Sequence, residues 1–81
     1  MPRLKRLSGK EIVRIFHRLG FVAEDQRGSH IKLRRLAPDG SRQTLTIPDH
    51  AEIDTGTLRA IYRQALRYVP KGELHPHFYA E

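Results

Sequence analysis

The sequence predicts an α+β fold in which two helices pack on one face of a three-stranded antiparallel sheet, in the order α-β-β-β-α. A helical pattern extends from Ser8 to Gly20, three short extended segments separated by turn signals follow, and a second helical pattern begins near residue 54. With 81 residues, the chain is long enough for one small domain and too short for two independent cores. We expect one domain over residues 1–69 and a loosely held C-terminal tail over residues 70–81.

The first helix has a complete start signal. Ser8 can cap the first backbone amides, Glu11 completes a capping box three residues later, and Leu7 can pack on Ile12. Gly20 supplies the left-handed residue that ends the helix. The apolar positions recur at helical spacing: Ile12, Ile15, Phe16 and Leu19. The outer face is basic: Lys10, Arg14, His17 and Arg18.

The three strands are predicted over residues 21–26, 29–36 and 42–47. In the second and third, apolar residues alternate with polar ones, which is typical of strands buried on one face. The buried set is Ile31, Leu33, Leu45 and Ile47. Turns are expected at Arg27-Gly28 and at Pro38-Asp39-Gly40.

The second helix is expected to begin with a cap at Asp54 or Thr55 and to continue through Tyr68. Its apolar stripe is Leu58, Ile61, Tyr62, Ala65 and Leu66. Beyond it, two prolines, one glycine and the lack of a clear period predict the loosely held tail.

The positive charge is unevenly distributed. The net charge is +6, and the first 35 residues alone hold ten basic residues against three acidic ones. This excess favours a polyanionic partner over an anionic membrane surface. No long apolar run indicates a membrane span or a signal peptide, and the chain has no cysteine. A cytoplasmic protein without disulfides is the expected class.

The segment Arg27-Gly28-Ser29-His30 is the strongest candidate for chemistry. Strand alternation places His30 on the open face of the sheet with Lys32 and Arg34. RNA can be cleaved without a metal when its own 2′-OH attacks the adjacent phosphorus, provided that a group moves a proton and cations stabilise the phosphoryl oxygens. Imidazole titrates near pH ~6.5 and can take either role. The alternative interpretation is that His30 is an ordinary polar residue on a half-buried strand.

Four segments of the chain, in this order and spacing, resemble the HicA family of small mRNA-interferase toxins. They are Ser8-Gly9-Lys10-Glu11, Gln26-Arg27-Gly28-Ser29-His30, Ile47-Pro48-Asp49-His50 and Gly56-Thr57-Leu58-Arg59-Ala60-Ile61. The resemblance implies a fold like that of double-stranded RNA-binding domains, a catalytic role for His30, and a HicB-like antitoxin that covers the His30 face.

The remaining site residues follow from the resemblance and from their charge. We expect RNA phosphates to be bound by Arg27, Gly28, Ser29, Lys32, Arg34 and Lys10. His50 is a candidate second acid-base group, with a role in loop packing as the alternative. His75-Pro76-His77 has too few ligating neighbours to predict a metal site, and we expect no metal or other cofactor.

The resulting hypothesis is a toxin that acts as a metal-independent endoribonuclease on mRNA. Its expected partners are mRNA and the antitoxin, with no membrane and no DNA bound by the chain alone. The alternatives are a non-catalytic RNA-binding module and an inactive toxin that retains only its protein partner. Thr57-Leu58-Arg59 lacks the lysine cluster with which duplex-binding domains of this fold grip phosphates, and the second and third strands lack the stacking aromatics of single-strand binders.

Overall fold

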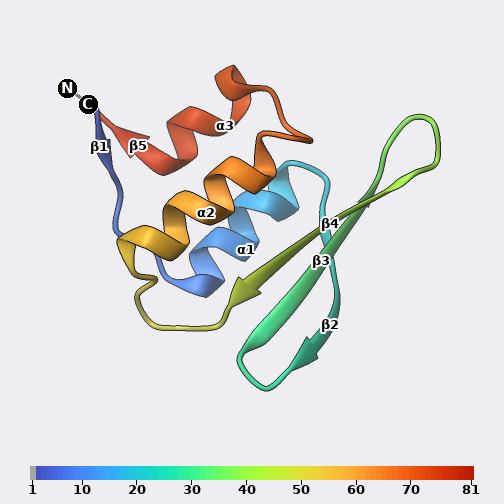
Figure 1. The fold of residues 1–81 in the computed structure, drawn as a ribbon, viewed down its shortest axis with the longest axis horizontal. Coiled ribbons are helices and arrows are strands. Elements are labelled where there is room, and N and C mark those ends of the chain that lie inside the picture. The colour runs from blue at the N-terminus through green and yellow to red at the C-terminus, as the bar shows by residue number, and fades with distance from the viewer. Residues whose placement is uncertain (1) are drawn as a thin grey trace.

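A three-stranded antiparallel sheet in the order β2-β3-β4 forms one layer of the fold in this computed structural model, which describes residues 2–81. The strands are β2 (Val22–Arg27), β3 (His30–Leu36) and β4 (Arg42–Pro48). The predicted alternation is confirmed, because the four expected apolar side chains of β3 and β4 are buried. The hairpin that joins β3 to β4 extends beyond the helices (Figure 1).

Two helices, α1 (Gly9–Arg18) and α2 (Thr55–Ala65), cover one face of this sheet, as the sequence predicts. Both halves of the capping box are present: the amide of Glu11 donates to the Ser8 hydroxyl at 3.1 Å, and the amide of Ser8 donates to the Glu11 carboxylate at 2.9 Å. Asp54 caps α2 by accepting from the amide of Thr57 at 3.0 Å. The α+β core is thus confirmed and is compatible with the arrangement of double-stranded RNA-binding domains.

The end of α2 differs from the prediction. The helix ends at Ala65 instead of continuing through Tyr68, and its last turn closes with a 2.9 Å hydrogen bond from the amide of Tyr68 to the carbonyl of Ala65. Val69 lies in the core at this point. The chain therefore turns early enough to bring the following residues back over the helices.

The prediction of a loosely held tail over residues 70–81 is wrong. Residues 71–78 form a third helix, α3 (Lys71–Phe78), in which Leu74 and Phe78 have no exposed surface. The ring of Phe78 packs against Phe16 of α1 and Tyr62 of α2, with centroid separations of 5.9 and 5.4 Å. Burial of two large apolar side chains outweighs the helix-breaking effect of Pro76.

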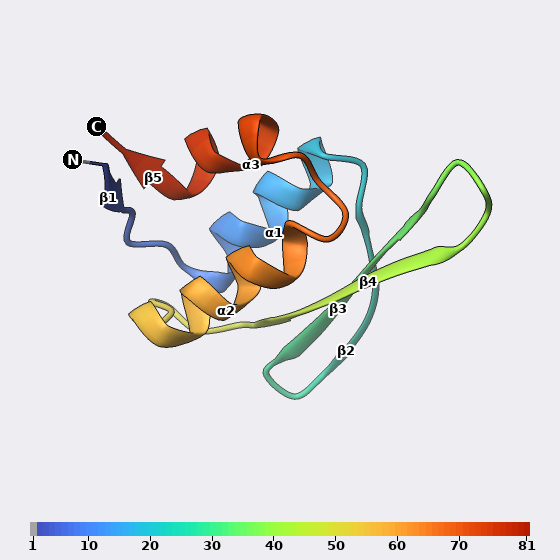
Figure 2. The same cartoon turned by 45° about the horizontal axis from the view of Figure 1, so that its top comes forward.

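The two ends of the chain meet beside α3. Strand β5 (Tyr79–Ala80) pairs antiparallel with β1 (Arg3–Leu4), and neither strand was expected from the sequence. The amide of Lys5 donates to the carbonyl of Phe78 at 2.8 Å. Figures 1 and 2 show N and C side by side, with α3 lying across the helical layer.

One basic residue of the first half has a structural role. The guanidinium of Arg35 donates to the carbonyls of Leu19 and Tyr68 at 2.7 and 2.8 Å, and to the Gln43 side chain at 2.7 Å. It also lies 4.8 Å from the ring centre of Phe21. Arg35 thus links α1, the sheet and the end of α2, and its donors are occupied within the fold.

Candidate active site

His30 is the first residue of β3 and lies on the face of the sheet away from the helices. It follows a tight turn in which Gly28 has a φ of +57°, a conformation that L side chains rarely adopt. Across the sheet His30 pairs with Arg27 of β2 and with Pro48 of β4. Its side chain is exposed. The imidazole is therefore held by a rigid strand and remains open to a ligand.

The predicted cations do share the face of His30, but each is paired with an acidic side chain. Arg27 Nε lies 3.3 Å from Asp25 Oδ2, Lys32 Nζ lies 3.9 Å from Glu24 Oε1, and Arg34 Nε lies 2.7 Å from Glu24 Oε2. The last contact is an ion pair whose Nε–H is not aligned for a hydrogen bond. Two carboxylates thus offset part of the charge of the three cations on this face.

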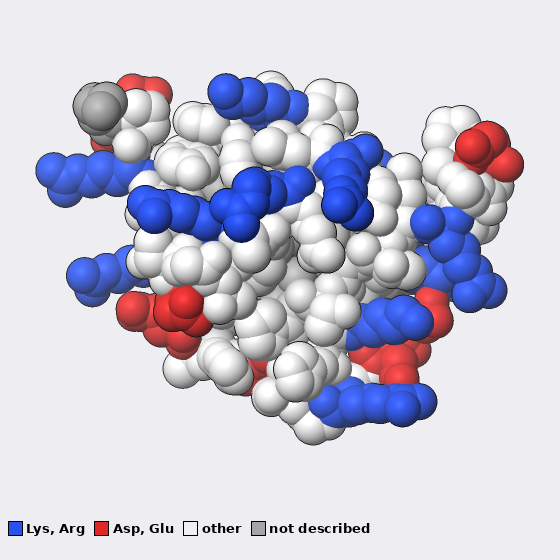
Figure 3. Space-filling model, in the orientation of Figure 1, with Lys and Arg blue, Asp and Glu red and all other residues white. Residues whose placement is uncertain are grey.

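A break in strand register explains how Glu24 reaches these cations. Asp25 pairs with Lys32, but the next pair joins Ala23 to Leu33, so Glu24 lies in a bulge. Without the bulge, Glu24 would stand opposite Leu33, on the face that packs against the helices. Figure 3 shows acidic side chains directly against basic ones over the strands.

Two shallow hollows meet at His30. The first lies over the sheet and is lined by Asp25, Arg27, His30, Lys32 and Thr46. The second lies between the sheet and the start of α2, where the lining residues are His30, Thr46, Pro48, His50, Asp54 and Thr57. The structure thus brings His50 to the same hollow as His30, while Arg34 lies further along β3.

Asp54 is the acidic group in the second hollow. The hydroxyl of Thr57 donates to Asp54 Oδ1 at 2.7 Å. This hydrogen bond, the second one from the Thr57 amide and the nearby His50 hold the pKa of Asp54 below its ordinary value. The carboxylate is therefore ionised at neutral pH and places a negative charge in the hollow that His50 also lines.

The loop after β4 positions this site by binding two neighbouring segments. The amide of Asp49 donates to the carbonyl of Ser29 at 2.6 Å, and the Gln26 side chain bridges the carbonyl of Gly28 and the carboxylate of Asp49 at 3.1 and 3.3 Å. The backbone of the turn is thus fixed to the loop that carries His50.

The same loop contacts the start of α1. The amide of Gly9 donates to the carbonyl of His50 at 2.9 Å. A Cβ at position 9 would overlap the carbonyl oxygen of Pro48, so only glycine permits this approach. Lys10 is exposed in the first turn of α1, beside this contact, and lines neither of the hollows at His30. Of the expected site residues, Lys10 is thus the one that lies on a helix.

The histidines near the C-terminus face different hollows. His75 stacks on Tyr79 with ring centres 4.5 Å apart, whereas His77 lines a hollow with Lys5 and α1. Within residues 2–81, no three His, Cys, Asp or Glu side chains are grouped as metal ligands. In the same part of the chain, no helix has the length and apolar character needed to cross a membrane.

The fold and site define a small α+β domain with a histidine on an open, charged sheet face. The family model described as the HicA toxin of bacterial toxin-antitoxin matches residues 9–66. The chain belongs to the HicA toxin family, and it is therefore a toxin whose family implies an antitoxin partner. No curated protein matches the chain. The matched residues end before α3, so β1, α3 and β5 lie outside the region that defines the family.

Proposed function

We propose that this toxin is a metal-independent endoribonuclease that cleaves mRNA in the cytoplasm, with His30 as its catalytic residue. The observation that carries the proposal is the position of His30. Its imidazole is exposed between two hollows, one with cations and the other with a second histidine. A toxin of this family needs an activity that harms the cell, and RNA cleavage uses the groups that gather at His30.

The reaction needs only proton transfer and charge stabilisation. The 2′-oxygen of one nucleotide attacks the adjacent phosphorus, the P–O5′ bond breaks, and the products are a 2′,3′-cyclic phosphate and a free 5′-hydroxyl. One group accepts the proton of the 2′-OH and another donates a proton to the leaving oxygen. His30 takes one of these roles, and His50, which lines the same hollow, takes the other.

The cations beside His30 stabilise the charge that develops on the phosphoryl oxygens. Arg27 and Lys32 line the hollow over the sheet, and their ion pairs with Asp25 and Glu24 are exposed or long. Exposed ion pairs are worth only about 0–1 kcal/mol, so a phosphate can replace the carboxylates as partner. Arg34, the backbone of Gly28 and the hydroxyl of Ser29 are assigned to binding the flanking phosphates, and Lys10 extends this set onto α1.

Incubation of purified protein with RNA in the presence of EDTA tests the proposal. His30→Ala should reduce the cleavage rate by roughly 10²–10⁴-fold, which is the usual contribution of a general acid or base. His17→Ala is the matched control, because His17 is an exposed histidine on α1 that lines neither hollow at His30. Cleavage that is absent in the wild type, or equal in His30→Ala, would refute the catalytic assignment.

The same experiment separates the enzyme from a non-catalytic RNA-binding module. Both bind RNA with an affinity that falls with salt, so binding alone does not distinguish them. Only the enzyme cuts RNA in EDTA in a manner that depends on His30. RNA binding without cleavage would favour the RNA-binding module. A protein that binds the antitoxin but neither binds nor cleaves RNA would favour an inactive toxin.

We assign the antitoxin to the HicB family, which pairs with HicA toxins. We expect it to bind the face of the sheet that carries His30. A protein that covers both hollows at His30 would exclude RNA from the reacting groups. Acidic residues at its contact surface would be favoured by Arg27, whose side chain is exposed.

A further inference from the structure

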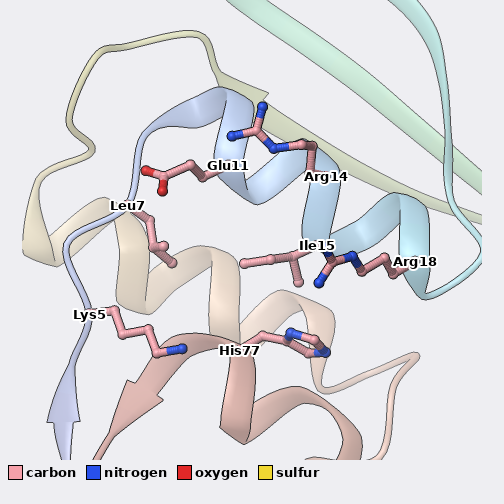
Figure 4. Close-up of a pocket in the computed structure, with 7 residues that line it drawn as sticks. All are labelled: Lys5, Leu7, Glu11, Arg14, Ile15, Arg18 and His77. Carbon is pink, nitrogen blue, oxygen red and sulfur yellow. The ribbon is translucent and has the colours of Figure 1, made fainter.

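A hollow outside the His30 site is built by α1 together with both ends of the chain. Its lining residues are Lys5, Leu7, Glu11, Arg14, Ile15, Arg18 and His77. Lys5 and His77 lie outside residues 9–66, and the pairing of β1 with β5 brings them together. Figure 4 shows the amine of Lys5, the guanidinium of Arg18 and the imidazole of His77 on the side of Ile15 that faces α3.

The cations of this hollow differ from those around His30, because none of them forms a salt bridge within the described residues. Within residues 2–81, Lys5, Arg14 and Arg18 form no salt bridge, whereas Arg27, Lys32 and Arg34 all do. The side chains of Arg14 and Arg18 also make no hydrogen bond to the described part of the protein. Their guanidinium donors are therefore available to an anion.

The one acidic residue of the hollow does not neutralise it. The carboxylate of Glu11 accepts from the amide of Ser8 at 2.9 Å, and Figure 4 shows it turned toward the start of α1. Lys5 is fixed in place, because its Nζ donates to the carbonyl of Pro76 at 3.1 Å. Two donors of this ammonium remain for a ligand. The hollow is thus a fixed concave surface with an excess of positive charge.

The hollow is also continuous with the His30 site along α1. Lys10, Arg14 and Arg18 follow one another at four-residue spacing, which places them on one face of the helix. Lys10 lies beside the contact between Gly9 and His50, and Arg18 lines the hollow. The eight helical steps from Lys10 to Arg18 span about 12 Å, which a stacked RNA strand covers in roughly four nucleotides.

We propose that this hollow binds a backbone phosphate of the RNA substrate, several nucleotides from the cleaved bond. The inference rests on the proposed function, because it takes RNA as the ligand of the His30 site. Its own support is that Lys5, Arg14 and Arg18 line the hollow without forming a salt bridge within the described residues, and that a row of cations along α1 leads to it.

The test measures RNA binding in the non-cleaving His30→Ala protein. The probe is a fluorescent single-stranded RNA of about 15 nucleotides, and its affinity is followed as a function of salt concentration. Arg14→Gln with Arg18→Gln should flatten the slope of log affinity against log salt by about 0.7 for each lost phosphate contact, or roughly 0.7–1.4 in total. Arg14→Lys with Arg18→Lys should restore most of the slope, since the charge is retained.

The matched control is Arg63→Gln with Arg67→Gln. These arginines are exposed in and just after α2, and the pair removes the same charge from a surface that lines none of the hollows described here. The control should change the slope by less than half as much, and melting temperatures verify that each variant is folded. If the two double variants change the slope of log affinity against log salt equally, the hollow has no special role and the proposal is overturned.

The outcomes separate this inference from the proposed function. If the wild type does not cleave RNA but the double substitution of Arg14 and Arg18 by Gln still flattens the salt dependence of RNA affinity, the enzyme assignment fails and the phosphate site stands. If cleavage depends on His30 while the slope is unchanged, the phosphate site is wrong. Loss of antitoxin binding with unchanged RNA binding would also overturn it, since the hollow would then contact protein.

Discussion

Replacing Phe78 with alanine tests whether α3 is an integral part of the domain. The side chain has no exposed surface and packs on aromatic rings of α1 and α2. Removal of such a ring lowers the free energy of unfolding by about 3–5 kcal/mol. A domain of 81 residues has a total of roughly 4–12 kcal/mol, so Phe78→Ala should remove about a quarter of the stability or more. The melting temperature should fall by at least about 12 °C.

Urea unfolding followed by circular dichroism measures this change. Glu73→Gln is the control, because Glu73 is an exposed residue of the same helix, and its free energy of unfolding should change by less than about 1 kcal/mol. If Phe78→Ala lowers the free energy of unfolding by less than about 1 kcal/mol, residues 70–81 are loosely held. The packing argument for α3, and with it the hollow that contains His77, would then be refuted.

Two further predictions concern the start of α1. Gly9→Ala should lower the free energy of unfolding by about 1–3 kcal/mol and reduce RNA cleavage, because the new Cβ displaces the Pro48 carbonyl and the loop that carries His50. Urea unfolding measures this loss of stability, and an unchanged unfolding curve would contradict the prediction. Hydrogen bonds from Ser8 hold the pKa of Glu11 below its ordinary value of 4.5. The ionised carboxylate therefore stabilises the fold above that pH, and the stabilisation is lost as the pH falls through the lowered pKa. Unfolding of Glu11→Gln should depend less on pH between 6 and 3 than that of the wild type, and equal dependence would show that the capping box does not contribute.

The elements that the sequence predicts correctly are those with local signals. Ser8 and Glu11 lie three residues apart, and the alternation from His30 to Arg34 extends over a single strand. Each of these patterns is complete within one element. The orientation of His30, Lys32 and Arg34 toward the open face is therefore correct, because it follows from strand geometry alone.

The third helix was missed because its signals conflict. Leu74 and Phe78 lie four residues apart, which is a helical spacing, but Pro70, Gly72 and Pro76 argue against a helix of this length. Pro70 precedes the first helical residue, where a proline is tolerated. Pro76 is tolerated because the burial of two apolar side chains against α1 and α2 is a tertiary effect. No local sequence pattern indicates this packing of α3 on the other two helices.

The acidic partners of the cations at the site were missed for a different reason. Counting pairs back from the Arg27–His30 turn places Asp25 opposite Lys32, so the presence of this carboxylate on the His30 face was accessible from the sequence. Glu24 was not, because simple alternation assigns it to the helix-facing side. Only the bulge brings it to Lys32 and Arg34.

The bulge in β2 also affects how another chain can approach the protein. Strand β2 is an edge of the sheet, and an exposed edge is a template for pairing with a further strand. Here the register shift interrupts the row of edge amides and carbonyls, and Glu24, Asp25 and Arg27 place charges along it. Such an edge resists both aggregation and strand addition. A partner of this toxin is therefore expected to lie against the face of the sheet rather than to lengthen the sheet at β2.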